Sequence, residues 1–146
     1  MKVRILRVDK TLPVPQYKTQ GAAGFDFYVR ETTIIPAKGW AKAPANTIIQ
    51  TPPGYALKVM ARSSLAKNYP GIFLANSVGL IDSDFCGPND EIMISLYNMT
   101  DQEITITRGD RIAQGVFVKF ERADFEEVEE ARNNDRGGFG STGLGA

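Results

Sequence analysis

Arg62 is followed directly by two hydroxyl side chains, Ser63 and Ser64, in the stretch ARSSLAKN at residues 61–68. A guanidinium, two hydroxyl donors and the backbone N–H groups of a helical turn would together bind an anion such as a phosphate. The same residues would also suit an ordinary helix start, in which a serine caps the first turn and the arginine is solvated. The stretch alone leaves both interpretations open.

Two aspartates, Asp82 and Asp84, follow an apolar run in the stretch NSVGLIDSDFCG at residues 76–87. The apolar arms predict a β-hairpin, and the spacing of the aspartates would place both carboxylates on one face. A buried aspartate beside a phosphate would hold and deprotonate a water molecule. Two solvated aspartates in a turn are the alternative interpretation.

Asp26 lies between two phenylalanines in the stretch GFDF, where a buried carboxylate requires a partner or a metal ion. Further along, RGDRIAQG at 108–115 places Arg111 and Gln114 beside a tight turn. Ordinary hairpin chemistry also explains that second stretch, because Gly-Asp pairs are common in turns.

The glycine-rich stretch RGGFGSTG at 136–143 carries one cation, Arg136, one ring, Phe139, and the hydroxyls of Ser141 and Thr142. Bare glycine backbone approaches phosphates closely and donates N–H groups to them. An arginine adds bidentate phosphate contact, and a ring stacks on a base. A terminus without fixed structure is the alternative.

The composition excludes several kinds of chemistry. The 146 residues include no histidine and one cysteine, Cys86. Zinc held by His and Cys is therefore excluded within one chain, as are Ser-His and Cys-His nucleophile pairs. Any general base must be Asp, Glu, Lys or Tyr, and any metal is expected to be a hard cation such as Mg²⁺.

The charge and hydropathy patterns limit the kinds of binding partner that we expect. Seventeen acidic residues balance 17 basic ones, so no net basic field attracts a nucleic acid. No apolar run approaches the roughly 20 residues that span a bilayer, and no stretch resembles a secretory leader. We therefore expect a cytoplasmic protein of one domain, with neither a nucleic acid nor a membrane as partner.

Short strands must position these side chains. Runs rich in β-branched and aromatic residues, several of them alternating apolar with polar, predict strands at 3–8, 24–29, 32–35, 46–50, 55–61, 71–79, 91–100, 103–110 and 113–120. Pro-rich and Gly-rich turns separate them and indicate an all-β sandwich, jelly roll or distorted barrel. The two helical candidates are a short turn at SSLAKN and the acidic stretch 125–135, whose composition favours a solvated linker.

Five of these stretches, in this order, resemble the five motifs of the trimeric-type dUTPases, which hydrolyse dUTP to dUMP and pyrophosphate. They are AAGFDFYV (22–29), ARSSLA (61–66), GLIDSDFCG (79–87), RGDRIAQGVF (108–117) and RGGFGSTG (136–143). The resemblance covers nearly the whole chain. It implies a jelly-roll-like distorted β-barrel at 1–120, an acidic linker at 121–135 and a flexible Gly-rich C-terminal lid at 136–146. It also implies a homotrimer with shared active sites.

The resemblance further implies a role for each motif residue. Asp82 would activate the water that attacks the α-phosphorus, with Asp84 and Arg111 as structural support. The phosphates would be bound by Arg62, Ser63, Ser64, Gln114, Arg136, Ser141 and Thr142. Uracil and deoxyribose would be bound by Asn76, Gly79, Ile81, Phe85 and Phe139. Asp26 would contact, through water, a Mg²⁺ ion that the three phosphates chelate.

Three features depart from the family pattern. Phe85 stands where the family usually has tyrosine, although the ring alone suffices to stack beneath the sugar and exclude a 2′-hydroxyl. The stretch PNDE after Gly87 is longer than the common pattern. Arg136 abuts the glycines directly, so Arg132 is an alternative ligand of the γ-phosphate.

Two other functions remain open at this point. The first is a dCTP deaminase, or a bifunctional deaminase and diphosphatase, on the same fold, for which Glu91 is the one nearby acid that would serve as proton shuttle. The second is a regulatory protein that senses a nucleotide without hydrolysing it.

Overall fold

Short strands dominate the computed structural model, which describes residues 1–135, 137 and 138. In these residues the chain forms the helix α1 (Leu65–Asn68) and the strands β1 (Arg4–Arg7), β2 (Phe25–Asp26), β3 (Thr33–Ile35), β4 (Trp40–Pro44), β5 (Thr47–Gln50), β6 (Tyr55–Ala61), β7 (Ile72–Leu74), β8 (Gly79–Ile81), β9 (Met93–Asn98), β10 (Ile104–Ile106) and β11 (Ala113–Lys119). The all-β prediction is confirmed.

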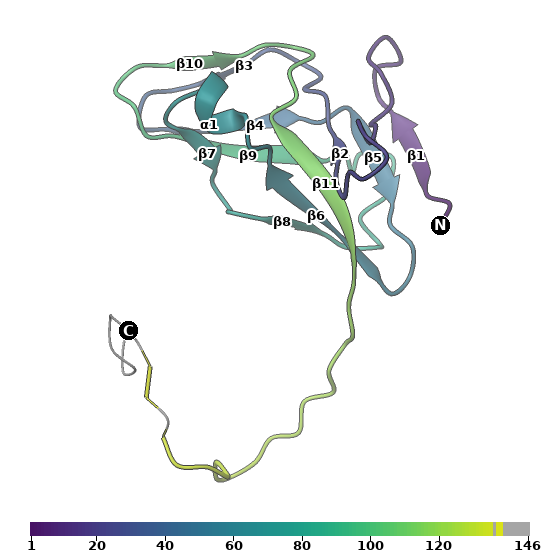
Figure 1. Cartoon of the computed structure of the whole chain (residues 1–146), viewed down its shortest axis with the longest axis vertical. Coiled ribbons are helices and arrows are strands. Elements are labelled where there is room, and N and C mark those ends of the chain that lie inside the picture. Colours follow the sequence, from purple (N-terminus) through teal and green to yellow (C-terminus); the bar gives the residue numbers. More distant parts are fainter. Residues whose placement is uncertain (136, 139–146) are drawn as a thin grey trace.

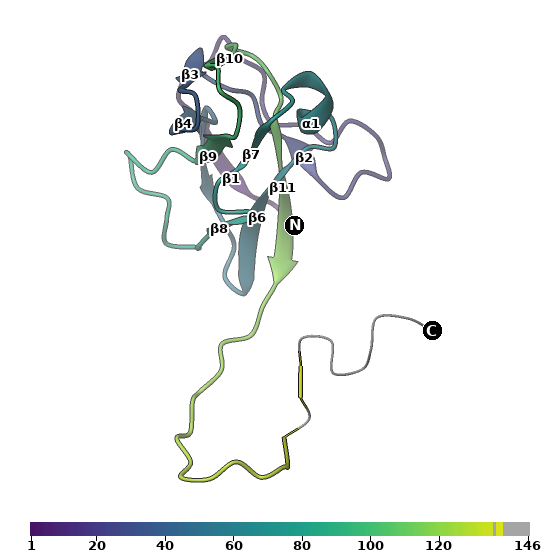
Figure 2. The same ribbon diagram turned by 90° about the vertical axis from the view of Figure 1, so that its left-hand side faces the viewer.

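The strands form antiparallel sheets that wrap around one interior, as in a jelly-roll barrel (Figures 1 and 2). The largest sheet has the order β2-β11-β6-β8, and a three-stranded sheet has the order β4-β9-β7. Two further pairs, β1-β5 and β10-β3, complete the body. Both of the larger sheets supply the core, for example Leu57 of β6 and Leu96 of β9, each fully buried.

A glycine lets two of the sequence motifs pack closely. Gly115 of β11 lies opposite Phe25 of β2 in the antiparallel ladder. A methyl group added at Gly115 would lie 2.5 Å from the Phe25 ring and 3.0 Å from the Phe27 ring. The two rings meet edge to face, with centroids 5.2 Å apart. This close packing fixes the place of the residue between them, Asp26.

The predicted hairpin at 76–87 is wrong, because β8 is the one strand that the structure shows in this stretch and it pairs with β6. The strand predicted at 71–79 is also wrong, because it is broken at 75–78. The strands on either side of the turn at 75–78 do not pair with one another: β7 pairs with β9, and β8 pairs with β6. The turn carries the chain from one sheet to the other through Ser77, whose φ is 60°. The reason is burial, because Leu74 packs inside the barrel and Gly79 lies directly against Val59 of β6.

The position of the two acidic residues changes accordingly. Asp82 and Asp84 lie in the turn that follows β8, and both are exposed in the single chain. They are therefore not two residues on one face of a strand, and their spacing of two residues in the sequence belongs to a turn instead.

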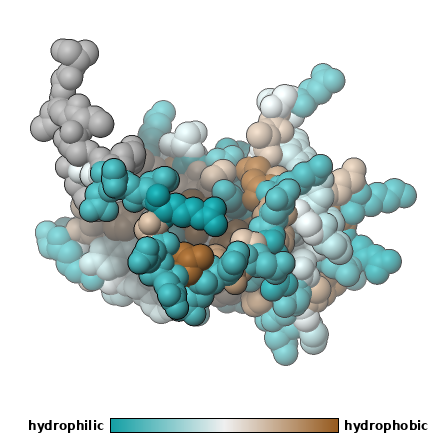
Figure 3. Space-filling model, turned by 90° about the horizontal axis from the view of Figure 1, so that it is seen from below, coloured by the Kyte–Doolittle hydropathy of each residue, from teal (hydrophilic) through white to brown (hydrophobic). Residues whose placement is uncertain are grey.

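Residues 121–135 form neither helix nor strand, and every one of them is exposed. They lead away from the end of β11 and from the barrel (Figures 1 and 2). On the face seen in Figure 3, hydrophilic side chains surround a few apolar ones. The one helix in the described part of the chain falls short of what crossing a membrane by a helix requires.

Candidate active site

Asp26 is buried and holds two arginines from distant parts of the sequence. Its Oδ1 lies 2.8 Å from Nε of Arg62, and its Oδ2 lies 2.9 Å from Nη1 of Arg111. Nη1 of Arg62 also donates to the backbone carbonyl of Arg111 at 2.8 Å. The partner that a buried carboxylate requires is thus supplied by the protein itself, because two guanidinium groups balance its charge.

The turn after β6 presents the hydroxyl pair. The backbone N–H of Arg62 donates to the carbonyl of Ile112 at 3.0 Å, and that of Leu65 donates to the carbonyl of Arg62 at 3.0 Å. Ser64 occupies the N-cap position of α1, yet its side chain makes no capping hydrogen bond. Ser63 is exposed. The capping interpretation therefore does not account for the two hydroxyls, which remain available to a ligand.

Gln114 joins the same cluster from β11. It lies opposite Asp26 on one side and opposite Met60 of β6 on the other. Its Nε2 donates to the carbonyl of Ala61 at 3.1 Å, immediately before Arg62. Gly24 leaves the room that this requires, because a methyl group there would lie 2.8 Å from Oε1 of Gln114. The first, second and fourth motifs therefore converge on one place.

A polar hollow of about 500 Å³ opens beside this cluster. It is lined by Arg62, Ser64, Leu65, Asn68, Tyr69, Gly109, Asp110, Arg111 and Ile112. Its cations and hydroxyl are groups that bind phosphates. Asn68, Tyr69 and Asp110 were not singled out in the sequence. Asp110 is part of a motif that also suits a simple turn, and nothing in the sequence around Tyr69 marks it.

A second, smaller hollow of about 80 Å³ lies where β7 turns into β8. Asn76, Gly79 and Ile81 line it, together with residues of β6 and β9. Asp82 follows Ile81 directly, and Phe85 lies one turn further on with 40% of its surface exposed. The backbone N–H of Phe85 donates to the carbonyl of Asp82 at 3.3 Å, so the two residues belong to one tight turn.

Among the described residues, the two hollows share no lining residue. The first holds the candidate phosphate ligands Arg62 and Ser64, and the second holds the candidate base-binding residues. The structure of one chain therefore separates the candidate residues into two groups.

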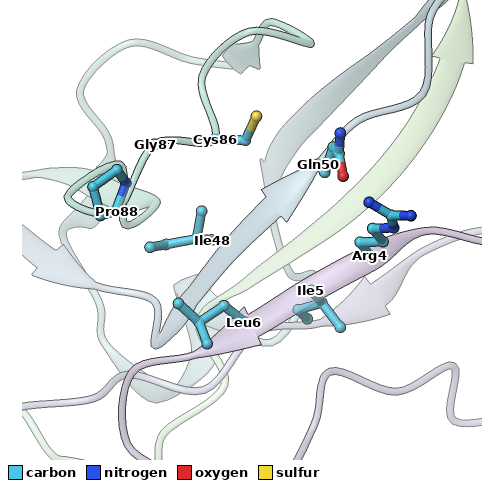
Figure 4. A pocket seen from close by; sticks show the side chains of 8 residues that line it. All are labelled: Arg4, Ile5, Leu6, Ile48, Gln50, Cys86, Gly87 and Pro88. Carbon is cyan, nitrogen blue, oxygen red and sulfur yellow. The ribbon is translucent and has the colours of Figure 1, made fainter.

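A third hollow, of about 240 Å³, involves the extension after Gly87 (Figure 4). Cys86, Gly87 and Pro88 face β1 and β5 across it, where Arg4 and Gln50 also contribute. The extension itself forms a closed turn, since the backbone N–H of Gly87 donates to Oδ2 of Asp90 at 2.6 Å. It is thus a compact turn beside the N-terminal strand.

The family model for dUTPase matches residues 10–143 of this sequence. The chain belongs to the dUTPase family. The match includes all five of the stretches whose order suggested the resemblance. The family is therefore shown by nearly the whole chain and not by a single motif.

Individual dUTPases resemble the chain over most or nearly all of its length. A deoxyuridine 5'-triphosphate nucleotidohydrolase of Helicobacter pylori strain J99 is 36% identical over 99% of this chain and 98% of its own length. The crystal structure of the dUTPase from Streptococcus mutans superposes with a TM-score of 0.75 at 34% identity, covering 86% of this chain and all of that one. The dUTPase of Staphylococcus bacteriophage 80alpha, solved with dUPNHPP, shares the fold with a TM-score of 0.85 at 20% identity, covering 98% and 99% of the two chains.

Glu91, the candidate proton shuttle of a deaminase, is committed to a structural role within the barrel. Its carboxylate accepts hydrogen bonds from Nε of Arg30, at 2.9 Å to Oε1 and 3.2 Å to Oε2, and from Nη2 of Arg30, at 2.9 Å to Oε2. The backbone N–H of Asn46 donates to it at 2.8 Å. The hydrogen bonds to Glu91 raise the pKa of Arg30 above its usual value. Glu91 therefore connects Arg30 to the backbone at Asn46 and stabilises the fold.

The candidate lid residues Arg136, Phe139, Ser141 and Thr142 lie outside the described residues. Arg132, the alternative phosphate ligand, is described and is exposed in the segment that leaves the barrel. In the described part of the chain, no three acidic or cysteine side chains gather in a way that would hold a metal ion.

Proposed function

We propose that this chain hydrolyses dUTP to dUMP and pyrophosphate. The observation that carries the proposal is the match to the dUTPase family over residues 10–143. The 36% identical H. pylori protein, named deoxyuridine 5'-triphosphate nucleotidohydrolase, supports it over 99% of the chain. A small nucleotide is thus the substrate.

Asp82 is the proposed general base. Its carboxylate takes a proton from a water molecule, whose oxygen forms a bond to the α-phosphorus. The bond from that phosphorus to the bridging oxygen breaks, and pyrophosphate leaves with the electron pair. The absence of histidine from the sequence supports a carboxylate in this role. Asp82 is exposed in a turn, where a substrate can reach it.

The phosphates are proposed to bind at the polar hollow through Arg62 and Ser64, which line it, and through the neighbouring Ser63 and Gln114. Asp26 and the carbonyl of Arg111 engage Nε and Nη1 of Arg62. A guanidinium has five N–H donors, so this arginine keeps donors for a phosphate while its orientation is fixed. Fixed donors stabilise the charge that develops on the phosphates in the transition state.

The base is proposed to bind at the small hollow through Asn76, Gly79 and Ile81. Backbone and amide groups that pair with uracil leave cytosine with unpaired groups. A cytosine nucleotide is therefore disfavoured against a uracil nucleotide by several orders of magnitude. The ring of Phe85 is proposed to lie beneath the sugar and to exclude the 2′-hydroxyl of UTP.

Mg²⁺ is proposed as the cofactor, and the residues present fit an ion held mainly by the substrate. Both oxygens of Asp26 already accept hydrogen bonds from arginines, and the described residues offer no cluster of carboxylates around it. Magnesium commonly keeps several waters and binds through substrate phosphates with one or two carboxylates. When bound, the ion would neutralise phosphate charge, with Asp26 at most touching its hydration shell.

A homotrimer with shared sites is proposed for the assembly. The separation of the candidate phosphate and base ligands into two hollows supports it, because facing copies would bring the two groups together. The exposed segment 121–135 supports it as well, since it leads away from its own barrel. The tail residues Arg136, Phe139, Ser141 and Thr142 are proposed to close over the nucleotide as a lid.

The experiment that tests this function is pyrophosphate release from dUTP, dCTP, dTTP and UTP, each with Mg²⁺ and with a chelator. We expect release from dUTP with Mg²⁺ and a large loss of rate with chelator. Ammonia release from dCTP would instead establish a deaminase, which the engagement of Glu91 by Arg30 does not favour. Nucleotide binding without any release would establish a sensing protein.

A further inference from the structure

Tyr69 connects the end of the phosphate turn to a second, distant turn. It follows α1 directly, and its hydroxyl donates a hydrogen bond to Oδ2 of Asp110. The two residues are both partly buried and both line the polar hollow. Burial, and next the hydrogen bond to Asp110, raise the pKa of Tyr69 above its usual value, so its hydroxyl stays protonated and remains a donor.

Asp110 is a fixed acceptor for this bond. Its Oδ2 also accepts the backbone N–H of Thr107 at 2.8 Å, and its own N–H donates to the carbonyl of Thr107 at 3.1 Å. Its carbonyl accepts the N–H of Val29 at 2.9 Å. The turn closes at Gly109, where φ is 91°. Three hydrogen bonds that involve backbone groups therefore hold Asp110 in place as the acceptor.

The other end of the phosphate turn is attached to the residues that follow Asp110. Arg62 donates through its backbone N–H to Ile112 and through Nη1 to the carbonyl of Arg111. The turn from Arg62 to Tyr69 is thus joined at both ends to three consecutive residues, 110–112. Ser63 and Ser64 lie between the two attachment points.

The helix between these points needs such an attachment. It has four residues, of which Leu65 alone is buried, and its N-cap side chain makes no hydrogen bond. An isolated helix of this length is not stable in water, because the conformational entropy lost in nucleating the helix outweighs the hydrogen bonds that one turn forms. Its geometry therefore depends on tertiary contacts, which are the packing of Leu65 in the core and the hydrogen bonds at the two ends of the turn.

We propose that Tyr69 is a positioning residue of the phosphate site. Its hydroxyl fixes the C-terminal end of the turn that begins at Arg62. The position of this turn then determines where the hydroxyls and N–H groups of Ser63 and Ser64 contact the outer phosphates. The inference rests on the proposed function, because it assigns a role within the site for that reaction. It predicts that the loss of this one hydroxyl affects ligands with a triphosphate more than ligands with one phosphate.

The test is Tyr69→Phe, which keeps the ring and removes the hydrogen bond. We expect the dissociation constant of dUPNHPP to rise by roughly fivefold or more, because small displacements of binding groups are costly in a preorganised site. The dissociation constant of dUMP should change by less than about twofold, since it has no outer phosphates. For dUTP hydrolysis we expect a larger effect on KM than on kcat.

Tyr28→Phe is the matched control. Tyr28 accepts a hydrogen bond from Nζ of Lys18 at 2.9 Å on the surface, and it does not line the polar hollow. This variant also loses one tyrosine hydroxyl and its hydrogen bond, and both dissociation constants should stay at their wild-type values. A thermal melt of each variant separates a general loss of stability from the selective loss of triphosphate binding.

A second variant tests the pairing itself. Asp110→Asn alters the acceptor of this hydrogen bond. The double variant Tyr69→Phe/Asp110→Asn should bind dUPNHPP little worse than whichever single variant binds it less tightly, because the effects of substitutions at two interacting residues do not add. Equal weakening of dUMP and dUPNHPP, or no weakening of either, would overturn the positioning role while wild-type dUTP hydrolysis stands. A wild-type protein that releases no pyrophosphate from dUTP would overturn the proposed function, and this inference with it.

Discussion

Asp26 and Arg62 form an ion pair of 2.8 Å that joins the first and second motifs of the sequence. The carboxylate is the buried member, with 8% of its side chain exposed against 25% for the guanidinium. Arg111 bonds the other oxygen from the fourth motif. One anion therefore orients two cations, each of which keeps donors on its accessible side.

Asp26→Asn should lower both stability and turnover. The amide cannot balance the charge of two guanidinium groups. Breaking a fully buried ion pair lowers the free energy of unfolding by about 3–5 kcal/mol, and the partial exposure of both arginines reduces this loss to about 2–3 kcal/mol here. Urea unfolding measures the loss, and dUTP hydrolysis should fall because Arg62 is no longer held. Asp101→Asn is the control, since its pair with Lys38 is well exposed and should contribute less than about 1 kcal/mol. Equal losses in the two variants would contradict the anchoring role of Asp26.

Much of the fold could be predicted because local pattern decides it. The strand predicted at 55–61 matches β6 from Tyr55 to Ala61, and the short helical turn predicted in SSLAKN contains α1. Strand β4, from Trp40 to Pro44, was not predicted, because its lysine, alanine and proline residues do not favour strands. Its cross-strand pairing with β9 supplies the stability that its own sequence lacks.

The candidate site was predictable only as separate motifs. Sequence patterns indicated that Asp26 requires a partner, but not that Arg62 and Arg111 supply it, because those contacts depend on how β2, β6 and β11 align. The pairing of β7 and β8 with different sheets was equally hidden, since the apolar run at 71–79 predicts one continuous strand. Tyr69 was missed because its hydrogen bond to Asp110 leaves no periodic signal in the sequence.

Asp82→Asn should lower kcat by at least roughly 100-fold, because general-base catalysis typically contributes that much or more. Stability should not change, since Asp82 is exposed in a turn. The dissociation constant of dUPNHPP should also stay near that of the wild type. Pyrophosphate release under saturating dUTP is the measurement, and Asp84→Asn is the matched control in the same turn. Near-normal turnover in Asp82→Asn would sink this assignment and point to Asp84 as the base.

Phe85→Ala should raise the activity on UTP relative to dUTP. Removing the ring opens space beneath the sugar, where a 2′-hydroxyl then fits. Phe85→Tyr should be nearly silent, because it keeps the ring and its face. The ratio of kcat/KM for the two nucleotides is the measurement. If the alanine variant rejects UTP as strongly as wild type does, another residue excludes the ribose.

Gly115→Ala should destabilise the protein by about 1–3 kcal/mol, the usual cost of overpacking a core. The new methyl group would lie 2.5 Å from the Phe25 ring, so the ring must move and Asp26 with it. We therefore expect reduced turnover as well as a lower midpoint in urea. Gly21→Ala is the control, since nothing lies within 4 Å of its added methyl group and its stability should change by less than about 0.5 kcal/mol. Equal midpoints for the two variants would show that the packing at Gly115 is not tight.

A mixing experiment tests the shared site directly. One parent is Asp82→Asn, and the other lacks residues 136–146. Each should be nearly inactive alone, the first without its base and the second without the proposed lid. The exposed segment 121–135 is long enough to cross to a neighbour, because 15 residues at up to ~3.3 Å each span about 40–50 Å.

Unfolding the two parents together and refolding them should restore activity if base and lid come from different copies. A site is repaired when its Asp82 comes from the truncated chain and its tail comes from the Asp82→Asn chain. With equal amounts and random assortment in a cyclic trimer, about one site in four meets both conditions, so about a quarter of wild-type activity should return. Refolding each parent alone gives the baseline. If base and tail act within one chain, every site keeps one lesion and the mixture stays at that baseline, which would contradict the exchange of tails between copies.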